Sequence, residues 1–280
     1  MRTIQAETVT AAVAEMCIEA NIELGADMRA ALAAAAEKEE SPLGKEILGT
    51  LQENLKIAKE DRIAICQDTG MTVVFASVGQ DVHIEGGALT DAINEGVRRG
   101  YRDGYLRKSV VRDPLDRVNT GDNTPAIIHY DIVPGDRLTL TVAPKGAGSE
   151  NMSKSIMLKP ADGVEGVKAA VLQAVKEAGP NACPPMVVGV GIGGNFEKRA
   201  ELSKKALTRP LNEKAASEAT QALEAEILTM INKTGIGPAG LGGRITALAV
   251  NVETYPTHIA QLPVAVNICC HVNRHSTRTL

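Results

Sequence analysis

The sequence predicts an α/β fold in which N-terminal helices are followed by mixed β-sheets flanked by helices. Apolar residues recur at helical spacing through residues 6–60, and beyond them short β-rich runs alternate with helical segments. Hydrophobic residues make up 44% of the 280-residue chain but aromatic residues only 2%, so Ala, Val, Leu and Ile must fill the core. This length predicts one domain over 1–280, or two lobes, a helical one at 1–60 and an α/β one at 61–280.

Helices are expected in three places near the N-terminus. The first has an apolar face formed by Val9, Val13, Met16, Cys17 and Ala20. Met28–Lys38 is rich in alanine, the strongest helix former, and Leu43–Lys59 carries its apolar residues along one side.

From residue 61 onward, strands and helices alternate. The predicted strands are Arg62–Cys66, Met71–Val78, Ala126–Val133, Arg137–Ala143, Met186–Val190, Ile245–Glu253 and Val264–Cys270. The predicted helices are Leu89–Tyr101, Val164–Ala178, Glu197–Leu207 and Ser217–Lys233. Pro134-Gly135-Asp136 is a typical turn sequence, which predicts that the strands on either side of it pair as a hairpin.

Charge and hydropathy argue against several classes of function. The net charge is −4 and there is no basic stripe with interleaved aromatic residues, which argues against a nucleic-acid partner. No apolar run reaches the roughly 18 residues that span a bilayer, and the N-terminus lacks the pattern of a secretory signal. The cysteines are therefore expected to be reduced thiols in the cytoplasm.

Three cysteines lie in polar segments marked by glycine or proline. Cys66 precedes a polar turn, Cys183 precedes two prolines, and Cys270 ends a predicted strand. No two of them form a CxxC pair, which argues against a structural zinc ribbon. Three thiolates brought together by folding can hold an iron–sulfur cluster, leaving one iron free to polarise a substrate oxygen. The alternatives are a buried structural thiol for Cys66 and an ordinary helix stop before the two prolines.

The other two cysteines are expected to be structural or to compete for one position. Cys17 lies on the apolar face of a predicted helix and is expected in the core. Cys269 and Cys270 are adjacent at a strand end, so their side chains point to opposite faces and at most one is a ligand.

Two glycine-rich segments follow predicted strands. The segment beginning Lys145-Gly146-Ala147 can present successive backbone amides to an anion, or it is a flexible turn. Gly189–Gly194 matches the dinucleotide fingerprint G-x-G-x-x-G, but no acidic residue ends a second strand about 20 residues further on. We therefore expect a close turn for packing or for a small anion, with an NAD-linked oxidoreductase as the remote alternative.

Arg107 and His258 are candidates for contact with a substrate. Arg107 lies in a basic stretch, where an arginine fork can hold a carboxylate and a solvated loop is the alternative. His258 lies in a loop framed by Pro256 and Pro263 and could orient a substrate or move a proton, although a lone histidine is more often structural.

As a set, these segments resemble the iron–sulfur-dependent (class I) fumarate hydratase family, which includes tartrate dehydratase. The resemblance covers nearly the whole chain and is carried by Cys66-Gln67-Asp68-Thr69-Gly70, Leu106-Arg107, residues 119–126, Lys145-Gly146-Ala147-Gly148-Ser149, Ala182-Cys183-Pro184-Pro185 and Asn267-Ile268-Cys269-Cys270-His271. The chain is similar to the alpha subunit of the two-subunit form, because it stops where single-chain members continue into a second domain.

The resemblance implies a [4Fe–4S] cluster, a dicarboxylate substrate and a separate beta subunit. The implied positions are Cys66, Cys183 and Cys270 for the cluster, Gln67, Arg107 and Gly146 for the substrate, and Asp68 and His258 for catalysis. Cys270 is favoured over Cys269 because the family's ligand falls four residues before an arginine, here Arg274. The beta subunit would supply the catalytic base and further carboxylate clamps.

The activity that the resemblance implies is the reversible hydration of fumarate to L-malate by a hydro-lyase. An L-tartrate dehydratase alpha subunit is the alternative within the family. Outside the family, the alternatives are the NAD-linked oxidoreductase and an iron–sulfur scaffold or redox sensor without enzymatic activity.

Overall fold

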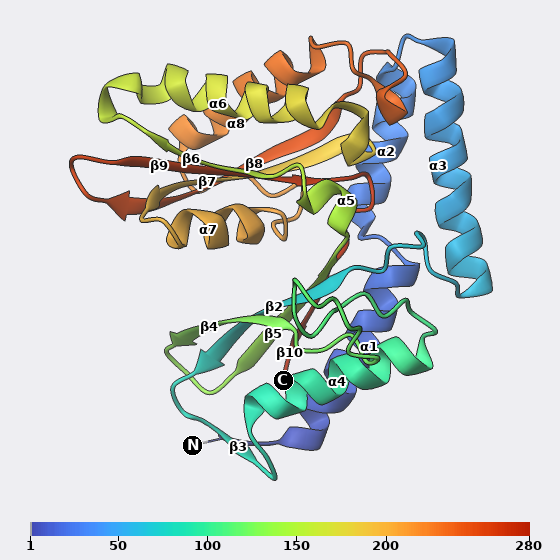
Figure 1. Cartoon of the computed structure of the whole chain (residues 1–280), viewed down its shortest axis with the longest axis vertical. Coiled ribbons are helices and arrows are strands. Elements are labelled where there is room, and N and C mark those ends of the chain that lie inside the picture. Colours follow the sequence, from blue (N-terminus) through green and yellow to red (C-terminus); the bar gives the residue numbers. More distant parts are fainter. Residues whose placement is uncertain (1) are drawn as a thin grey trace. The chain divides into compact units, whose positions relative to one another are not determined.

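The computed structural model describes residues 2–280, which form two compact units (Figure 1). Unit 1 comprises Met1–Gly25, Leu55–Ala147 and Arg274–Leu280, and unit 2 comprises Ala26–Asn54 and Gly148–Asn273. The chain has the predicted α/β class, with N-terminal helices followed by mixed sheets. The units do not coincide with the lobes expected at 1–60 and 61–280, because each is assembled from segments far apart in the sequence.

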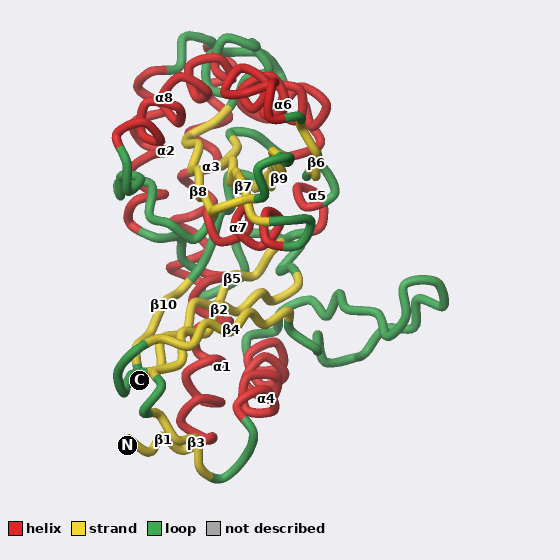
Figure 2. Tube along the Cα trace, turned by 90° about the vertical axis from the view of Figure 1, so that its left-hand side faces the viewer, coloured by secondary structure: helices red, strands yellow, loops and turns green. Residues whose placement is uncertain are grey.

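Unit 1 is a sheet with helices on one face. Its strand order is β10-β5-β2-β4, and β1 pairs with β3 beside it. The strands are β1 (Arg2–Gln5), β2 (Met71–Gly79), β3 (Val82–Glu85), β4 (Ile127–Val133), β5 (Leu138–Lys145) and β10 (Ser276–Thr279). Helices α1 (Ala6–Ile22) and α4 (Leu89–Asp103) cover one face, as Figure 2 shows, and bury Val74, Leu140 and Val142 against it.

The predicted hairpin between residues 126–133 and 137–143 is wrong. Strand β2 lies between β4 and β5, parallel to β4 and antiparallel to β5. Val73 of β2 therefore has Ile127 on one side and Ala143 on the other. β2 is the most continuously buried strand of this sheet. Its central position explains this, because a neighbouring strand on each side helps to shield its apolar side chains from water.

The predicted strand Arg62–Cys66 is also wrong. Helix α3 (Pro42–Asp61) ends at Arg62, whose φ of 54° is left-handed, and the chain then runs through bends to Gly70. Ile65 N donates to the Asn21 carbonyl at 2.9 Å and pairs with no strand. Cys66 therefore lies on an irregular loop whose shape is set by its own hydrogen bonds.

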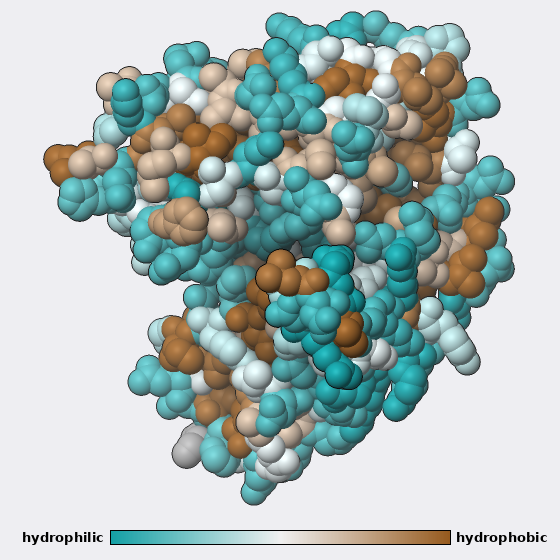
Figure 3. Space-filling model, in the orientation of Figure 1, coloured by the Kyte–Doolittle hydropathy of each residue, from teal (hydrophilic) through white to brown (hydrophobic). Residues whose placement is uncertain are grey.

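The open edge of the unit 1 sheet carries exposed apolar side chains. In β4, Ile127 is 44% exposed and Ile132 is 70% exposed. Hydrophobic side chains gather over β4 in Figure 3. Among the helices of residues 2–280, none combines the length and the apolar composition needed to cross a membrane.

Unit 2 is a sheet with helices on both faces (Figure 1). Its order is β6-β9-β7-β8, with β7 parallel to β8 and antiparallel to β9. Its elements include β6 (Lys154–Leu158), β7 (Met186–Gly194), β8 (Ala247–Thr257), β9 (Leu262–Cys269), α2 (Ala26–Lys38), α6 (Gly163–Ala178), α7 (Lys198–Ala206) and α8 (Glu218–Asn232). Helices α6 and α8 cover one face and α7 the other, which places Val188, Val190 and Val266 in a closed core.

The glycines of the dinucleotide-like segment lie inside β7 and serve packing. A Cβ atom at Gly189 or Gly191 would collide with the carbonyl oxygens of Ser203 or Arg199 in α7, and one at Gly193 would collide with Tyr255 of β8. These glycines allow α7 and β8 to approach the backbone of β7. The expected packing role of these glycines is confirmed, but the segment forms a strand and not the expected turn.

Gly191→Ala is therefore expected to destabilise the protein by about 2 kcal/mol, because a methyl group must push α7 away from the sheet. Gly49→Ala is the matched control in the same unit, since a Cβ there meets nothing within 4 Å and removing a helical glycine should stabilise slightly. Urea unfolding checks both variants. Equal stability of Gly191→Ala and the unchanged protein would contradict the packing role.

Candidate functional site

The segments that carry Cys183 and Cys270 lie side by side at one end of the unit 2 sheet. Cys183 follows a 3-10 turn and has a left-handed φ of 51°, and Cys270 directly follows β9. Strands β7 and β9 are antiparallel, which brings the start of β7 beside the end of β9. His271 N donates to the Cys183 carbonyl at 3.4 Å, and His271 Nδ1 lies 3.0 Å from the same oxygen.

The accessibility of the thiols separates candidate ligands from core cysteines. Cys66 and Cys270 are half-buried and Cys183 is exposed, whereas Cys17 and Cys269 are buried, and none of the five forms a disulfide in the described residues 2–280. Burial raises the pKa of the Cys17 thiol to about 12, so Cys17 remains a neutral thiol in the core. The prediction that Cys17 is a core residue is confirmed.

The thiols fit an iron–sulfur ligand set by their donor chemistry. Val272 N donates to Cys270 Sγ at 3.4 Å, and such amide bonds stabilise a thiolate that ligates iron. The backbone of Cys183 is in the left-handed region, and hydrogen bonds hold both its N–H and its carbonyl. Within residues 2–280, no three His, Cys, Asp or Glu side chains are placed as a ready metal site. Cys183 and Cys270 are thus the two expected ligands that lie in unit 2.

In unit 1, the carboxylate of Asp68 joins two expected site loops. Its Oδ1 accepts from Gly70 N at 3.0 Å, and its Oδ2 accepts from Ala147 N at 2.7 Å. A Cβ at Gly146 would lie only 3.0 Å from Asp68 Oδ2, so glycine there permits the close approach. The Cys66 loop and the Gly146 segment are thus adjacent, and Asp68 already binds two backbone amides.

Buried side chains beneath the Cys66 loop hold its backbone carbonyls. Tyr101 Oη lies 2.7 Å from the Thr69 carbonyl and 3.1 Å from that of Gly70, which also accepts from Asn123 Nδ2 at 3.1 Å. Arg274 Nη2 donates to the Asp68 carbonyl at 2.5 Å. Burial raises the pKa of Tyr101, so its hydroxyl stays a donor. We call Tyr101, Asn123 and Arg274 the carbonyl clamp.

Sequence reasoning did not identify the carbonyl clamp. Asn123 lies in a segment that carries the family resemblance, and Arg274 is the arginine that favoured Cys270 over Cys269, but nothing in their local pattern shows that they are buried. Their relative exposures of 0% and 4% arise from residues distant in the sequence. Tyr101 is 0% exposed although a tyrosine at the end of a helix is often half-buried.

Gln67 and Arg107 are the exposed polar side chains of the unit 1 candidate site. Both side chains are exposed, while the Arg107 main-chain carbonyl accepts from Thr69 Oγ1 at 3.1 Å. This bond fixes the backbone of Arg107 to the Cys66 loop and leaves its guanidinium in solvent. The arrangement is suited to a carboxylate ligand, because a guanidinium and an amide both donate hydrogen bonds.

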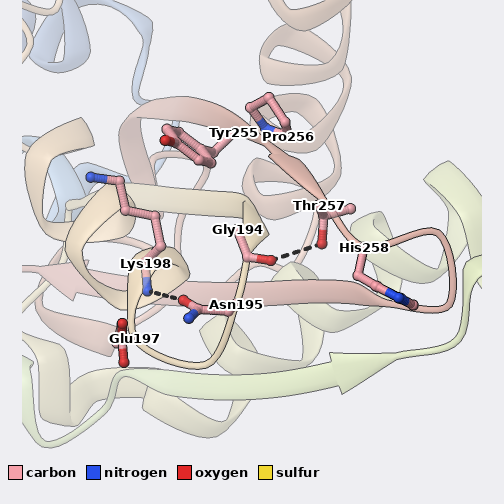
Figure 4. A pocket seen from close by; sticks show the side chains of 8 residues that line it. All are labelled: Gly194, Asn195, Glu197, Lys198, Tyr255, Pro256, Thr257 and His258. Atoms are coloured by element: carbon pink, nitrogen blue, oxygen red, sulfur yellow. Dashed lines mark hydrogen bonds between the residues drawn. The ribbon is translucent and has the colours of Figure 1, made fainter.

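His258 lies apart from the cysteine pair of its own unit. It is exposed at the turn between β8 and β9, and its Nδ1 accepts from Ala260 N at 3.2 Å. Cys270 follows the other end of β9, which at about 3.3 Å per residue spans about 25 Å, so the strand separates His258 from Cys270 by roughly that distance. His258, Lys198 and Tyr255 line a shallow cavity of about 460 Å³, and none of its lining residues is a cysteine. Figure 4 shows these side chains around the cavity.

Comparison with known proteins places this geometry in context. Residues 10–279 match the family described as Fumarate hydratase (Fumerase). A Methanocaldococcus jannaschii protein, whose name provisionally gives it as an L(+)-tartrate dehydratase subunit alpha, is 42% identical over 274 residues, 96% of each chain. The L(+)-tartrate dehydratase subunit alpha chains of two Escherichia coli strains are 34% and 33% identical over 245 residues, 86% of this chain and 80% of theirs.

Proposed function

Because the chain belongs to the class I fumarate hydratase/tartrate dehydratase family, as an alpha subunit, we propose that it catalyses the reversible hydration of fumarate to L-malate. The active enzyme would require a separate beta subunit. The names of the relatives, which give each as a subunit alpha, support this requirement. The proposal places the enzyme in a reducing compartment such as the cytoplasm, since its metal ligands would be thiolates.

One structural observation carries the proposal. The segments that carry Cys183 and Cys270 lie side by side in unit 2, joined by the contacts of His271 with the Cys183 carbonyl, while Cys269, the neighbour of Cys270, is buried with an exposure of 3%. We propose that these two thiolates and Cys66 hold a [4Fe–4S] cluster. When bound, such a cluster has one iron without a protein ligand and supplies a Lewis acid for the substrate hydroxyl.

The chain's own residues would bind and orient the dicarboxylate. Arg107 would hold one carboxylate through paired N–H donors, and the Gln67 amide would donate to the second carboxylate or to the hydroxyl. Dehydration of malate removes a proton from the carbon beside a carboxylate and expels the hydroxyl from the neighbouring carbon. Donors aimed at that carboxylate stabilise the negative charge that develops on it.

Asp68 and His258 receive different parts in the proposal. Asp68 accepts from Gly70 N and Ala147 N, so we propose that it orients the two site loops while remaining near the hydroxyl. His258 is held about 25 Å from Cys270 by β9, and it could move a proton at the site only across an interface with another chain. The beta subunit would supply the catalytic base.

The second candidate substrate is L(+)-tartrate, which the names of the similar relatives favour. It differs from malate by one hydroxyl, and part of the specificity would come from the beta subunit. A site that hydrogen-bonds the extra hydroxyl rejects a substrate lacking it by about 10⁴-fold or more. One substrate is therefore expected to dominate.

The deciding experiment is a paired assay of the reconstituted alpha–beta enzyme under anaerobic conditions. Fumarate, L-malate and L(+)-tartrate are each offered, and kcat/KM is measured with and without NAD. We expect turnover of fumarate and malate that does not depend on NAD. Turnover of tartrate alone would move the activity to the second candidate, and no turnover of any of these dicarboxylates with a full cluster would refute the proposal.

A further inference from the structure

A buried arginine lies beneath the loop that carries Cys66. Arg274 is 4% exposed. Its Nη2 donates to the Asp68 carbonyl at 2.5 Å, and its Nε donates to the Pro144 carbonyl at 3.2 Å. One guanidinium therefore joins the backbone of the Cys66 loop to the end of β5, two residues before Gly146.

The surroundings of Arg274 are unusual for a charged side chain. A guanidinium is always protonated and costly to bury, so buried arginines are normally paired with a carboxylate. The hydrogen bonds of Arg274 go to main-chain carbonyls, and its Nη1 is buried without a partner among residues 2–280. Arg278, four residues later, shows the ordinary arrangement, with partly exposed ion pairs to Glu15 and Glu19.

The rest of the carbonyl clamp acts on the same loop. Tyr101 and Asn123, both 0% exposed, bind the carbonyls of Thr69 and Gly70. Three consecutive carbonyls, from Asp68 to Gly70, are thus held from beneath by buried donors. Arg274 is the charged member of the clamp, and it holds the carbonyl nearest to Cys66 and Gln67.

We infer that Arg274 is a positioning residue that fixes the backbone of Asp68 and thereby sets the directions of the Cys66 and Gln67 side chains. Hydrogen bonds to a charged donor are stronger than those between neutral groups, so Arg274 should anchor the loop more firmly than Tyr101 or Asn123. The Asp68 carboxylate, which accepts from Gly70 N and Ala147 N, depends on the same anchor. The part that this plays in catalysis rests on the proposed function.

The anchor is tested on the chain alone, without cluster or substrate. In Arg274→Gln, the amides of Gly70 and Ala147 are expected to exchange with solvent about tenfold faster or more, because a charge-assisted anchor of their acceptor is lost. The Cys66 thiol should react faster with iodoacetamide. Arg278→Gln is the matched control on the same C-terminal segment and should leave both rates unchanged. Unchanged exchange and thiol reactivity in Arg274→Gln would overturn the inference.

Arg274→Lys covers the case in which the glutamine variant does not fold. It keeps the charge but loses the fork that reaches two carbonyls, so exchange at Gly70 and Ala147 should rise while the core amide of Val74 stays protected. A uniform rise that includes Val74 would show general destabilisation and would contradict a local anchor.

The loaded alpha–beta complex provides a readout that stability alone would not change. With iron content per chain matched, Arg274→Gln should alter the electron paramagnetic resonance spectrum of the reduced cluster and lower kcat about tenfold, because misplaced reacting groups lose rate. Arg274→Lys should restore part of both. An unchanged spectrum with unchanged kcat would contradict the role at the site. If the complex has no hydro-lyase activity, exchange in the chain alone still decides whether Arg274 anchors the loop.

Discussion

Cys183→Ser and Cys270→Ser, each purified anaerobically with the beta subunit, are expected to lose the visible absorbance of the cluster and the hydro-lyase activity together. The activity should fall by more than about a hundredfold, since changing even an outer partner of a metal ligand costs about 10- to 100-fold. Cys66→Ser should behave in the same way. Visible absorbance, iron content and turnover are measured on the same samples.

Cys269→Ser is the matched control for this prediction. Cys269 is adjacent to Cys270, but it is 3% exposed and belongs to β9, whereas Cys270 is half-buried beyond the strand end and accepts from Val272 N. The control should therefore keep its iron and most of its turnover while losing some stability. A Cys270→Ser protein with a full cluster, or a Cys269→Ser protein without one, would show that the ligand is assigned to the wrong neighbour.

Local sequence patterns located most helices and strands because their periodicity is a local property. The apolar face of α1 and the glycine-ended α6 both follow from side chains within a few turns of each other. Strand order is not local: β2 lies between β4 and β5, and β10 joins the sheet from the C-terminus. The hairpin prediction failed because a good turn sequence fixes a change of direction but not the pairing partner.

The candidate site was predictable to a similar extent. Polar cysteine segments and their neighbours were visible in the sequence. Alternation along the strand predicted that Cys269 and Cys270 face opposite ways, and the family resemblance favoured Cys270 as the ligand. The carbonyl clamp was not visible, because the roles of Tyr101 and Arg274 depend on burial by distant segments. The β7 glycines did indicate their packing role in the sequence. Gly189 and Gly191 are two residues apart and therefore lie on the same face of the strand, where a helix can pack closely.

Glu39 binds the backbone at the end of a glycine-rich loop of unit 2, residues 235–243, and is expected to contribute more stability than any surface charge. It is 1% exposed and directly follows α2. Its carboxylate accepts from the backbone N–H groups of Glu40 at 2.8 Å, Ser41 at 2.9 Å, Arg244 at 2.9 Å and Ile245 at 2.8 Å. A Cβ at Gly243 would lie 2.8 Å from Glu39 Oε1, so the loop packs directly on the carboxylate.

Glu39→Gln is expected to lower the free energy of unfolding at pH 7 by about 3 kcal/mol. The amide keeps one acceptor oxygen and turns an NH₂ group toward buried N–H donors, which leaves donors unpaired. Glu40→Gln is the matched control, because the Glu40 side chain is 70% exposed in its ion pair with Arg244. Exposed pairs contribute about 0 to 1 kcal/mol, so the control should unfold at nearly the unchanged urea concentration.

The pH dependence separates loss of the carboxylate from loss of packing. Burial alone would raise the pKa of Glu39, but the hydrogen bonds from Arg244, Ser41, Ile245 and Glu40 outweigh it and hold the pKa below the usual 4.5. The carboxylate thus contributes stability that is fully present above pH 4.5 and is lost as the pH falls through the lowered pKa. The stability difference between the unchanged protein and Glu39→Gln should therefore narrow below about pH 4.5. A difference that stays constant down to pH 3 (roughly a unit and a half below the usual carboxyl pKa) would contradict this account of Glu39.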